Sequence, residues 1–226
     1  MPPLSDKSRT NQYIELINTK PDYIVSNLHG LPQVNQKEIL AGKRTGFKSL
    51  YCEIGSGSGA HLIRQACANS ESFFTGLELR YKRIFRSAEK AEKLNLKNIL
   101  FFRQDAAHID KLFENNSLSG IYINFPDPWS DKQRWKKKQL LKIEYLINLN
   151  NLLKVNGFLS YKTDHKELFA EVTQRVRSLK CYNIVKISRD LLNSQYYEQN
   201  NQTEFEQLFI SKGYPIFFLF AEKVCE

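Results

Sequence analysis

The feature that most constrains the fold is an alternation of short apolar segments and helical patterns that begins at Ser49. Apolar runs of strand length recur along the chain, and segments with apolar residues at helical spacing separate them. Strands that alternate with helices of about 10 to 15 residues form right-handed βαβ units around a mostly parallel sheet. We therefore predict an α/β fold with a seven-stranded, mostly parallel sheet and helices on both faces. The strands are expected at residues 50–54, 73–79, 99–102, 120–124, 158–162, 182–187 and 216–221.

The helical patterns between the strands predict which side chains face the sheet. Two of them cover residues 60–68 and 84–94, and a longer one is expected to run to Leu153 and stop at Asn156-Gly157. A last pattern follows the strand at 158–162. The expected inward-facing residues are Leu62, Ile63 and Ala66; Ile84, Phe85, Ala88 and Ala91; Leu140, Ile143 and Ile147; and Leu168, Phe169, Val172, Val176 and Leu179.

The first 48 residues are polar and look irregular, apart from a short apolar pattern at Tyr13, Ile14 and Ile17. We predict that residues 1–48 form an N-terminal basic arm. This arm is expected to belong to the same domain as residues 49–226.

The composition favours an acidic partner. A chain of 226 residues with 42% hydrophobic content can bury one sizeable core. A net charge of +9 and a pI near 9.3 point to nucleic acid or an anionic membrane. The membrane is the weaker option, because no apolar run approaches the roughly 18 residues that span a bilayer. Since the start lacks the apolar core of a signal peptide, we expect a cytoplasmic protein. No obligatory protein partner is inferred, and the expected state is a monomer or a homodimer.

Cysteines and histidines do not fall at the spacings that bind metals. The four cysteines (Cys52, Cys67, Cys181 and Cys225) form no C-x-x-C pair, and the four histidines (His29, His61, His108 and His165) are equally scattered. Reduced thiols are therefore expected, and no structural or catalytic metal.

Acidic residues follow the ends of predicted strands, where parallel sheets bind their ligands. Glu53 precedes a glycine turn that includes Gly55 and Gly57, and Glu78 and Asp105 follow the next two strands. The turn also satisfies G-x-G-x-x-A, so a nicotinamide dinucleotide remains an alternative. Glu53 would repel a pyrophosphate but suits the ammonium and sulfonium groups of S-adenosylmethionine. Charge therefore favours the methyl donor, with Glu78 placed for its ribose and Asp105 for its adenine.

A fourth acid, Asp127, lies between two prolines in the segment I-Y-I-N-F-P-D-P-W, which ends the strand at 120–124. Each proline restricts the residue before it to an extended backbone, so Phe125 and Asp127 are expected to have little freedom. A basic run from Lys132 to Lys142 follows, with both tryptophans of the chain nearby. Its side chains Arg134, Lys136, Lys137 and Lys138 are interpreted as contacts to an RNA backbone, or alternatively as a solvated helix face.

Near the C-terminus, Thr203-x-x-Glu206 reads as a capping box that opens a helix. A capped helix start close to the open edge of the sheet is also a rigid place from which to hold a base. The pattern leaves both interpretations open.

Together these motifs resemble the bacterial tRNA (guanine-N7-)-methyltransferase family, a branch of the Rossmann-like class I S-adenosylmethionine-dependent methyltransferases. The resemblance covers roughly residues 50–222 and rests on E-I-G-S-G-S-G, G-L-E, Q-D-A, Y-I-N-F-P-D-P-W, Y-K-T-D, T-E-F-E and G-Y-P-I. It implies methyl transfer to N7 of a guanine in tRNA, at guanine 46 of the variable loop. The implied donor site comprises Glu53, Gly55, Gly57, Glu78, Asp105 and Asp127, with Asp127 also catalytic.

The same resemblance implies that the substrate guanosine contacts Asp164, Thr203, Glu204 and Glu206. In one place the chain departs from the family pattern. The family usually reads P-W-P-K-K-R-H, whereas Asp131 stands here in place of the first lysine. Lys132 is the residue that could take over its contact with the substrate.

Three competing functions remain at this stage. One is a methyltransferase that acts on the exocyclic amine of adenine, although the loop of those enzymes has adjacent prolines without an acid between them. The second is a non-catalytic RNA-binding module, and the third is a dehydrogenase.

Overall fold

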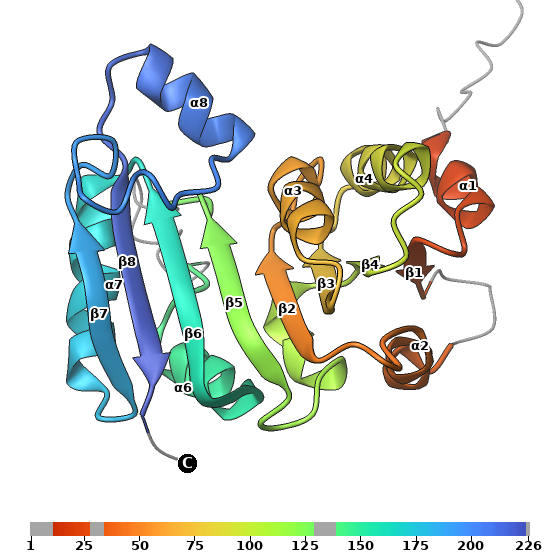
Figure 1. The fold of residues 1–226 in the computed structure, drawn as a ribbon, viewed down its shortest axis with the longest axis horizontal. Coiled ribbons are helices and arrows are strands. Elements are labelled where there is room, and N and C mark those ends of the chain that lie inside the picture. Colours follow the sequence, from red (N-terminus) through yellow and green to blue (C-terminus); the bar gives the residue numbers. More distant parts are fainter. Residues whose placement is uncertain (1–10, 28–33, 129–138, 225–226) are drawn as a thin grey trace, which may run out of the picture.

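The computed structural model describes residues 11–27, 34–128 and 139–224 (Figure 1). In this part of the chain eight strands form one sheet in the order β1-β4-β3-β2-β5-β6-β8-β7. β8 is antiparallel to both of its neighbours, and the other neighbouring pairs are parallel. The strands are β1 (Ile24–Ser26), β2 (Ser49–Ile54), β3 (Ser72–Leu77), β4 (Ile99–Arg103), β5 (Leu118–Asn124), β6 (Leu153–Thr163), β7 (Tyr182–Ser188) and β8 (Phe217–Lys223).

Helices cover both faces of the sheet, as predicted. The α-helices are α1 (Tyr13–Leu16), α2 (Gln36–Lys43), α3 (Ala60–Ala68), α4 (Tyr81–Lys93), α6 (Ile143–Leu152), α7 (Lys166–Ser178) and α8 (Glu204–Ser211). Two short 3₁₀ helices are η1 (Ile17–Thr19) and η2 (Ala106–Lys111). One apolar core lies between the sheet and α2, η2, α6 and α7. A second core lies on the other face, against η1, α3 and α4. The α/β fold with a mostly parallel sheet is therefore confirmed.

In three helices the buried residues agree with the inward-facing residues predicted from the sequence. Leu62, Ile63 and Ala66 of α3 are buried, and so are the four predicted residues of α4. In α7, Leu168, Phe169, Val172 and Val176 are buried, while Leu179 lies just beyond the helix and is half-buried.

The inward face predicted for α6 is wrong. Ile143 and Ile147 are each 42% exposed, whereas Leu146 and Leu149 are buried. Large apolar residues lie on both sides of this helix, isoleucines on the exposed side and leucines on the buried side, so the pattern alone could not distinguish them. The helix ends at Leu152, one residue before the expected Leu153, and β6 starts directly at Leu153.

Asn156-Gly157, which we predicted to end that helix, lies inside β6 instead. The pairing between β5 and β6 shifts register at this point, and Asn156 has a φ of +64°. Left-handed residues of this kind occur in strand irregularities as well as at helix ends, which explains the error.

The expectation that residues 1–48 are irregular, and that the sheet has seven strands, is also wrong. β1 adds an eighth strand by pairing in parallel with β4, with Ile24 opposite Phe101. Its residues Ile24 and Val25 are buried. Three residues are too few to produce a periodic pattern, and η1 and α2 on either side are also short.

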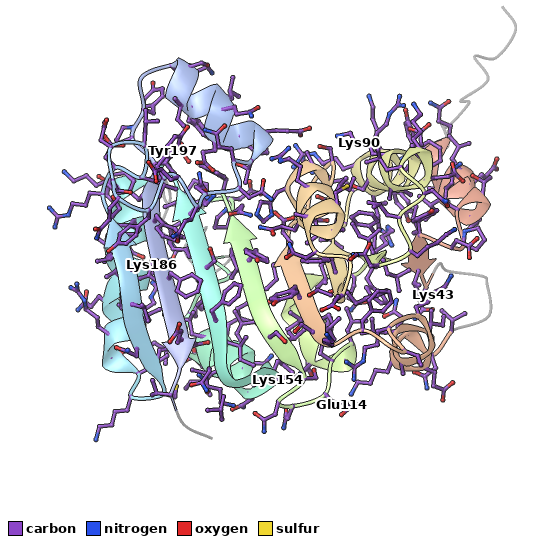
Figure 2. The ribbon with its side chains drawn as sticks, viewed as in Figure 1. Lys43, Lys90, Glu114, Lys154, Lys186 and Tyr197 are labelled. Carbon is purple, nitrogen blue, oxygen red and sulfur yellow. The ribbon has the colours of Figure 1, made fainter. Side chains whose placement is uncertain are left out.

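Strand order determines where a ligand can bind. β2 lies between β3 and β5, and the chain builds the sheet outward from β2 in both directions. In such sheets the crevice beyond the carboxyl ends of the strands, at this switch point, is the usual ligand site. Figure 2 shows Lys90 and Tyr197 near this end of the molecule, with Glu114 and Lys154 at the opposite end.

Candidate active site

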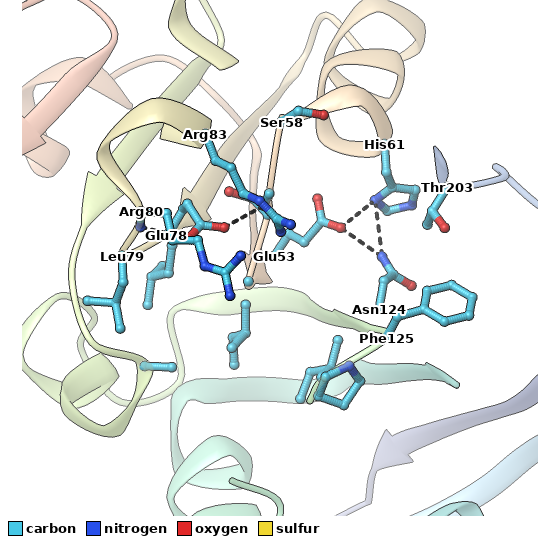
Figure 3. Close-up of a pocket in the computed structure, with 18 of the residues that line it drawn as sticks. Glu53, Ser58, His61, Glu78, Leu79, Arg80, Arg83, Asn124, Phe125 and Thr203 are labelled. Atoms are coloured by element: carbon cyan, nitrogen blue, oxygen red, sulfur yellow. Dashed lines mark hydrogen bonds and ion pairs between the residues drawn. The ribbon is translucent and has the colours of Figure 1, made fainter. Parts of the chain in front are cut away.

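A cavity of about 550 Å³ lies at the carboxyl ends of β2, β3, β4 and β5 (Figure 3). Eight of the residues predicted from the sequence line it: Glu53, Gly55, Gly57, Glu78, Asp105, Asp127, Thr203 and Glu204. The structure thus brings the four strand-end acids into one cleft, together with the start of α8.

The glycine turn between β2 and α3 needs a left-handed backbone at each of its three glycines, whose φ values lie between +57° and +76°. Glycine alone adopts this conformation without steric cost. At Gly59 a side chain is also excluded by space, since a Cβ there would lie 2.9 Å from Ser87. At Gly55 the position of a Cβ is open, so a ligand can approach the backbone.

Glu53 is held by two neighbours that sequence reasoning missed. Asn124 Nδ2 donates to Glu53 Oε1 at 2.8 Å, and His61 Nδ1 lies 3.3 Å from the same oxygen. The His61 ring makes an edge contact with Tyr122, which fixes its orientation. The other oxygen, Glu53 Oε2, is buried and has no hydrogen-bond partner among the described residues.

Glu78 and Asp105 are oriented by backbone N–H groups. The two oxygens of Glu78 accept from Gly57 N at 3.1 Å and from Arg80 N at 2.8 Å. Asp105 caps η2 by accepting from Ala107 N at 2.9 Å. Both carboxylates therefore have fixed positions on the cavity wall.

The loop that holds Asp127 differs from the prediction in one respect. Phe125 has a φ of +52°, in the left-handed region, rather than the extended backbone expected before Pro126. A bulky residue with this φ is strained and is kept there only by its surroundings. Two contacts hold it: Phe125 N donates to Lys162 O at 2.9 Å, and the Phe125 ring stacks on Phe209 with 5.5 Å between the ring centroids. Asp127 itself is exposed at the cavity rim.

The predicted capping box opens α8. Thr203 Oγ1 accepts from Glu206 N at 2.9 Å, and Glu206 Oε2 accepts from Thr203 N at 3.3 Å. Glu206 is fully buried and does not line the cavity. Its carboxylate pairs with Lys162 Nζ at 2.9 Å and accepts from Asn200 Nδ2. Burial lowers the pKa of Lys162, although the Glu206 charge opposes this shift.

Glu204, two residues earlier, connects α8 to the glycine turn and to α4 on the other side of the cavity. It accepts from Ser58 Oγ at 2.5 Å and from Lys90 Nζ at 3.2 Å. Partial burial raises the pKa of Glu204, but these two hydrogen bonds together with the positive charges of Lys90 and Arg64 outweigh it and keep the pKa below its ordinary value.

Other predicted residues do not lie in the cavity or cannot be placed. Asp164 follows β6 and is half-buried, but it is not part of the cavity wall. The predicted substrate lysine Lys132 and the basic residues Arg134, Lys136, Lys137 and Lys138 lie outside the described residues, as do Asp131 and both tryptophans.

The cavity residues that were not predicted as site residues include the polar or aromatic side chains of His61, Arg80, Arg83, Asn124 and Phe205. Asn124 and Phe205 lie inside two of the quoted motifs, and Arg80 lies two residues after Glu78, so the motifs could have indicated them. His61 and Arg83 lie on helices, where nothing in the sequence distinguishes a cavity-facing polar residue from a solvated one.

The described residues contain no helix that could span a membrane and no group of three or more potential metal ligands. Cys52 and Cys67 are free thiols, and Cys225 is outside the described part of the chain. Burial raises the pKa of the Cys52 thiol to about 12, which makes it unreactive at neutral pH.

Comparison with known proteins identifies the family. A family model described as "Putative methyltransferase" matches residues 48–219. A tRNA (guanine-N(7)-)-methyltransferase of Mycoplasma genitalium is 36% identical over 180 residues, which are 78% of this chain and 85% of that relative. The chain belongs to the tRNA (guanine-N(7)-)-methyltransferase family. The resemblance inferred from the motifs is confirmed, and the dehydrogenase and the non-catalytic module are set aside.

Other members of this family show similar identity. The Clostridioides difficile enzyme is 37% identical over 174 residues, or 77% of this chain and 80% of the relative. A bifunctional glycosyltransferase/methyltransferase of Fusobacterium nucleatum is 34% identical over 92% of this chain. The chain spans only about a third (32%) of the length of that relative.

Solved structures agree on the fold. The 16S rRNA methyltransferase KamB has a TM-score of 0.64 at 12% identity, over 88% of this chain and 98% of that one. The antibiotic-resistance methyltransferase Kmr has a TM-score of 0.62 at 16% identity, over 88% of this chain and 98% of that one. At such low identity the likeness concerns the Rossmann-like class I methyltransferase fold alone.

Proposed function

We propose that this methyltransferase transfers a methyl group from S-adenosylmethionine to N7 of a guanine in tRNA, giving 7-methylguanosine, and that the guanine is number 46 of the variable loop. One observation carries the proposal for this family member. Four carboxylates from successive strand ends, Glu53, Glu78, Asp105 and Asp127, line a single cavity beside a glycine turn. A cationic donor is the ligand that this arrangement suits.

The residues present fit such a donor. Three buried polar atoms on the cavity wall, Glu53 Oε2, Ser56 Oγ and Asn124 Oδ1, have no partner among the described residues. Buried polar groups are usually hydrogen-bonded, so these atoms are suited to contacts with a ligand bound in the cavity. The cavity volume also falls within the range of about 300 to 1,000 Å³ typical of small-molecule sites.

Donor binding would use the acids in the order of their strands. Glu53 suits the cationic methionine end, Glu78 the ribose hydroxyls and Asp105 the adenine amino group. S-adenosylmethionine supplies an electrophilic methyl group when it is bound. Guanine N7 has a free lone pair at neutral pH, so the chain needs no general base.

Asp127 is the proposed catalytic residue. Its carboxylate stabilises the positive charge that develops on the purine, and it can also accept hydrogen bonds from guanine N1–H and the exocyclic amine. Its place between two prolines orients it with little loss of entropy. Holding both reactants nearly in line supplies the rest of the acceleration.

The substrate side of the proposal rests on the start of α8. Thr203 and Glu204 line the cavity and are proposed to hold the guanosine, together with Asp164 and Lys132. Glu206 is buried against Lys162, so its proposed role is to position Thr203 and the helix. Arg134, Lys136, Lys137 and Lys138 remain the proposed contacts to the tRNA backbone. The absence of a metal, the cytoplasmic location and the monomeric or homodimeric state also remain predictions.

The test is incubation with labelled S-adenosylmethionine and unmodified tRNA, followed by nucleoside analysis for 7-methylguanosine. Asp127→Ala is expected to lower the turnover number about 10²-fold or more, with unchanged thermal stability. Asp127→Asn retains one hydrogen-bond acceptor without the charge, so it separates electrostatic stabilisation from orientation. Asp110→Ala, at an exposed acid of η2, is the matched control. Turnover within a few-fold of wild type in folded Asp127→Ala would contradict the catalytic role.

A further inference from the structure

Two arginines at the start of α4, Arg80 and Arg83, line the same cavity as the four acids. Among the described residues neither of them has an acidic partner at ion-pair distance. The neighbouring cations differ in this respect. Lys90 pairs with Glu204 and Lys162 pairs with Glu206. The cavity wall therefore presents positive charge that the described chain leaves available.

Arg83 is the arginine that reaches over the glycine turn. A Cβ added at Gly57 would lie 3.8 Å from Arg83 Nη1. Its Cζ lies 5.9 Å from the centre of the Phe205 ring. Figure 3 shows the side chain extending into the cavity between Glu78 and Glu53. A guanidinium has five N–H donors, and among the described residues no acceptor receives one from Arg83.

The chemistry of the proposed donor indicates what these N–H groups could bind. S-adenosylmethionine carries a sulfonium, an α-ammonium and an α-carboxylate. Glu53 suits the two cations, but the acids that line the cavity would repel the carboxylate. A planar guanidinium binds a carboxylate through two parallel hydrogen bonds, which makes arginine the best partner for it.

We propose that Arg83 binds the α-carboxylate of the methionine part of S-adenosylmethionine. The inference rests on the function proposed above, in which Glu53 takes the cationic methionine end. Arg83 lies over the glycine turn that follows Glu53, so it is placed for the carboxylate on the same carbon as the ammonium. In this role Arg83 determines specificity for an amino-acid-bearing donor.

The experiment combines a protein change with a matched ligand change. Calorimetry measures the Kd of wild type and Arg83→Gln for S-adenosylmethionine and for decarboxylated S-adenosylmethionine, which lacks only the carboxylate. Arg83→Gln is expected to weaken S-adenosylmethionine binding roughly 10- to 100-fold, the loss of a charge-assisted hydrogen bond. Its affinity for the decarboxylated ligand should stay within about two-fold of wild type. Arg86→Gln is the control, because Arg86 lies one turn further along α4 and pairs with Glu89 at 2.8 Å.

Several outcomes would overturn the assignment. Equal losses for both ligands would mean that Arg83 supports the cavity without contacting the carboxylate, and no loss for either would remove Arg83 from the site. Unchanged donor affinity with weakened tRNA binding would assign Arg83 to an RNA phosphate instead. If wild type bound no S-adenosylmethionine, the proposed function would fail together with this inference. Donor binding that is insensitive to Arg83→Gln would overturn this inference alone.

Discussion

Two carboxylates on the same helix, Glu204 and Glu206, have opposite environments. The Glu206 side chain is 1% exposed, and its ion-pair partner Lys162 is 5% exposed. The Glu204 side chain is 56% exposed, and its partner Lys90 is 42% exposed. One helix is thus attached to the sheet by a buried pair and to the opposite cavity wall by a solvated pair.

The difference shows that the two ion pairs cannot contribute equally to the free energy that holds α8 in place. A surface ion pair is worth about 0–1 kcal/mol, since solvent screens it. Removing one partner of a buried pair leaves an uncompensated charge and costs about 3–5 kcal/mol. The contact with Lys162 should therefore hold α8 in place, and the contact with Lys90 should open far more easily. The start of α8 lines the cavity, and Figure 1 shows this helix beyond the carboxyl ends of β5 and β6.

The largest expected effect is at the buried pair. Glu206→Ala should lower the free energy of unfolding by about 3–5 kcal/mol, because Lys162 stays buried without its counter-charge. Urea unfolding of wild type and variant measures it. The double variant Lys162→Met/Glu206→Leu should be more stable than Glu206→Ala, since it removes both charges. A loss below 1 kcal/mol in Glu206→Ala would show that the pair does not anchor α8.

A smaller effect is expected at the helix cap. Thr203→Ala removes the acceptor of Glu206 N and should cost about 0.5–2 kcal/mol, while Thr203→Ser should recover most of it. Measuring the KM for tRNA in parallel separates the two proposed roles of Thr203. Lower stability with an unchanged KM would leave only the cap, whereas a raised KM that serine restores would support a contact with guanosine.

The smallest effect is expected at Glu204. Glu204→Gln should cost less than about 1 kcal/mol at pH 7, because the pair is solvated. The pKa of Glu204 is lower in the folded protein than its ordinary value of 4.5, so its contribution is present above that pH and is lost as the pH falls through the folded pKa. The free energies of unfolding of wild type and Glu204→Gln, measured as a function of pH, should therefore become equal at acidic pH. A difference between the two free energies of unfolding that grows as the pH falls would contradict this predicted pH dependence.

The parts of the site that could be predicted from the sequence are those fixed by local backbone rules. A glycine turn after a buried strand has few possible conformations, and acids at the ends of parallel strands must meet at one edge of the sheet. That is why Glu53, Glu78, Asp105 and Asp127 were placed in one cleft. The capping box at Thr203 was predicted for the same reason, since its spacing has a local cause.

The parts that could not be predicted depend on tertiary contacts. The left-handed backbone of Phe125 is maintained by stacking on Phe209, more than 80 positions away in the sequence. The contact of His61 with Glu53 needs α3 to lie beside the end of β2. The predicted buried face of α6 was wrong because large apolar residues, isoleucines on one side and leucines on the other, lie on both of its sides. Each of these features is decided by residues that are distant along the chain.

The short strand β1 has a practical consequence for work with this protein. It covers the outer edge of β4, where Phe101 N donates to Tyr23 O at 2.8 Å. An N-terminal truncation that removes β1 would leave the N–H and C=O groups of β4 open to another chain, the situation that promotes edge-to-edge aggregation. A deletion past Ser26, intended to trim a dispensable tail, should therefore yield insoluble material.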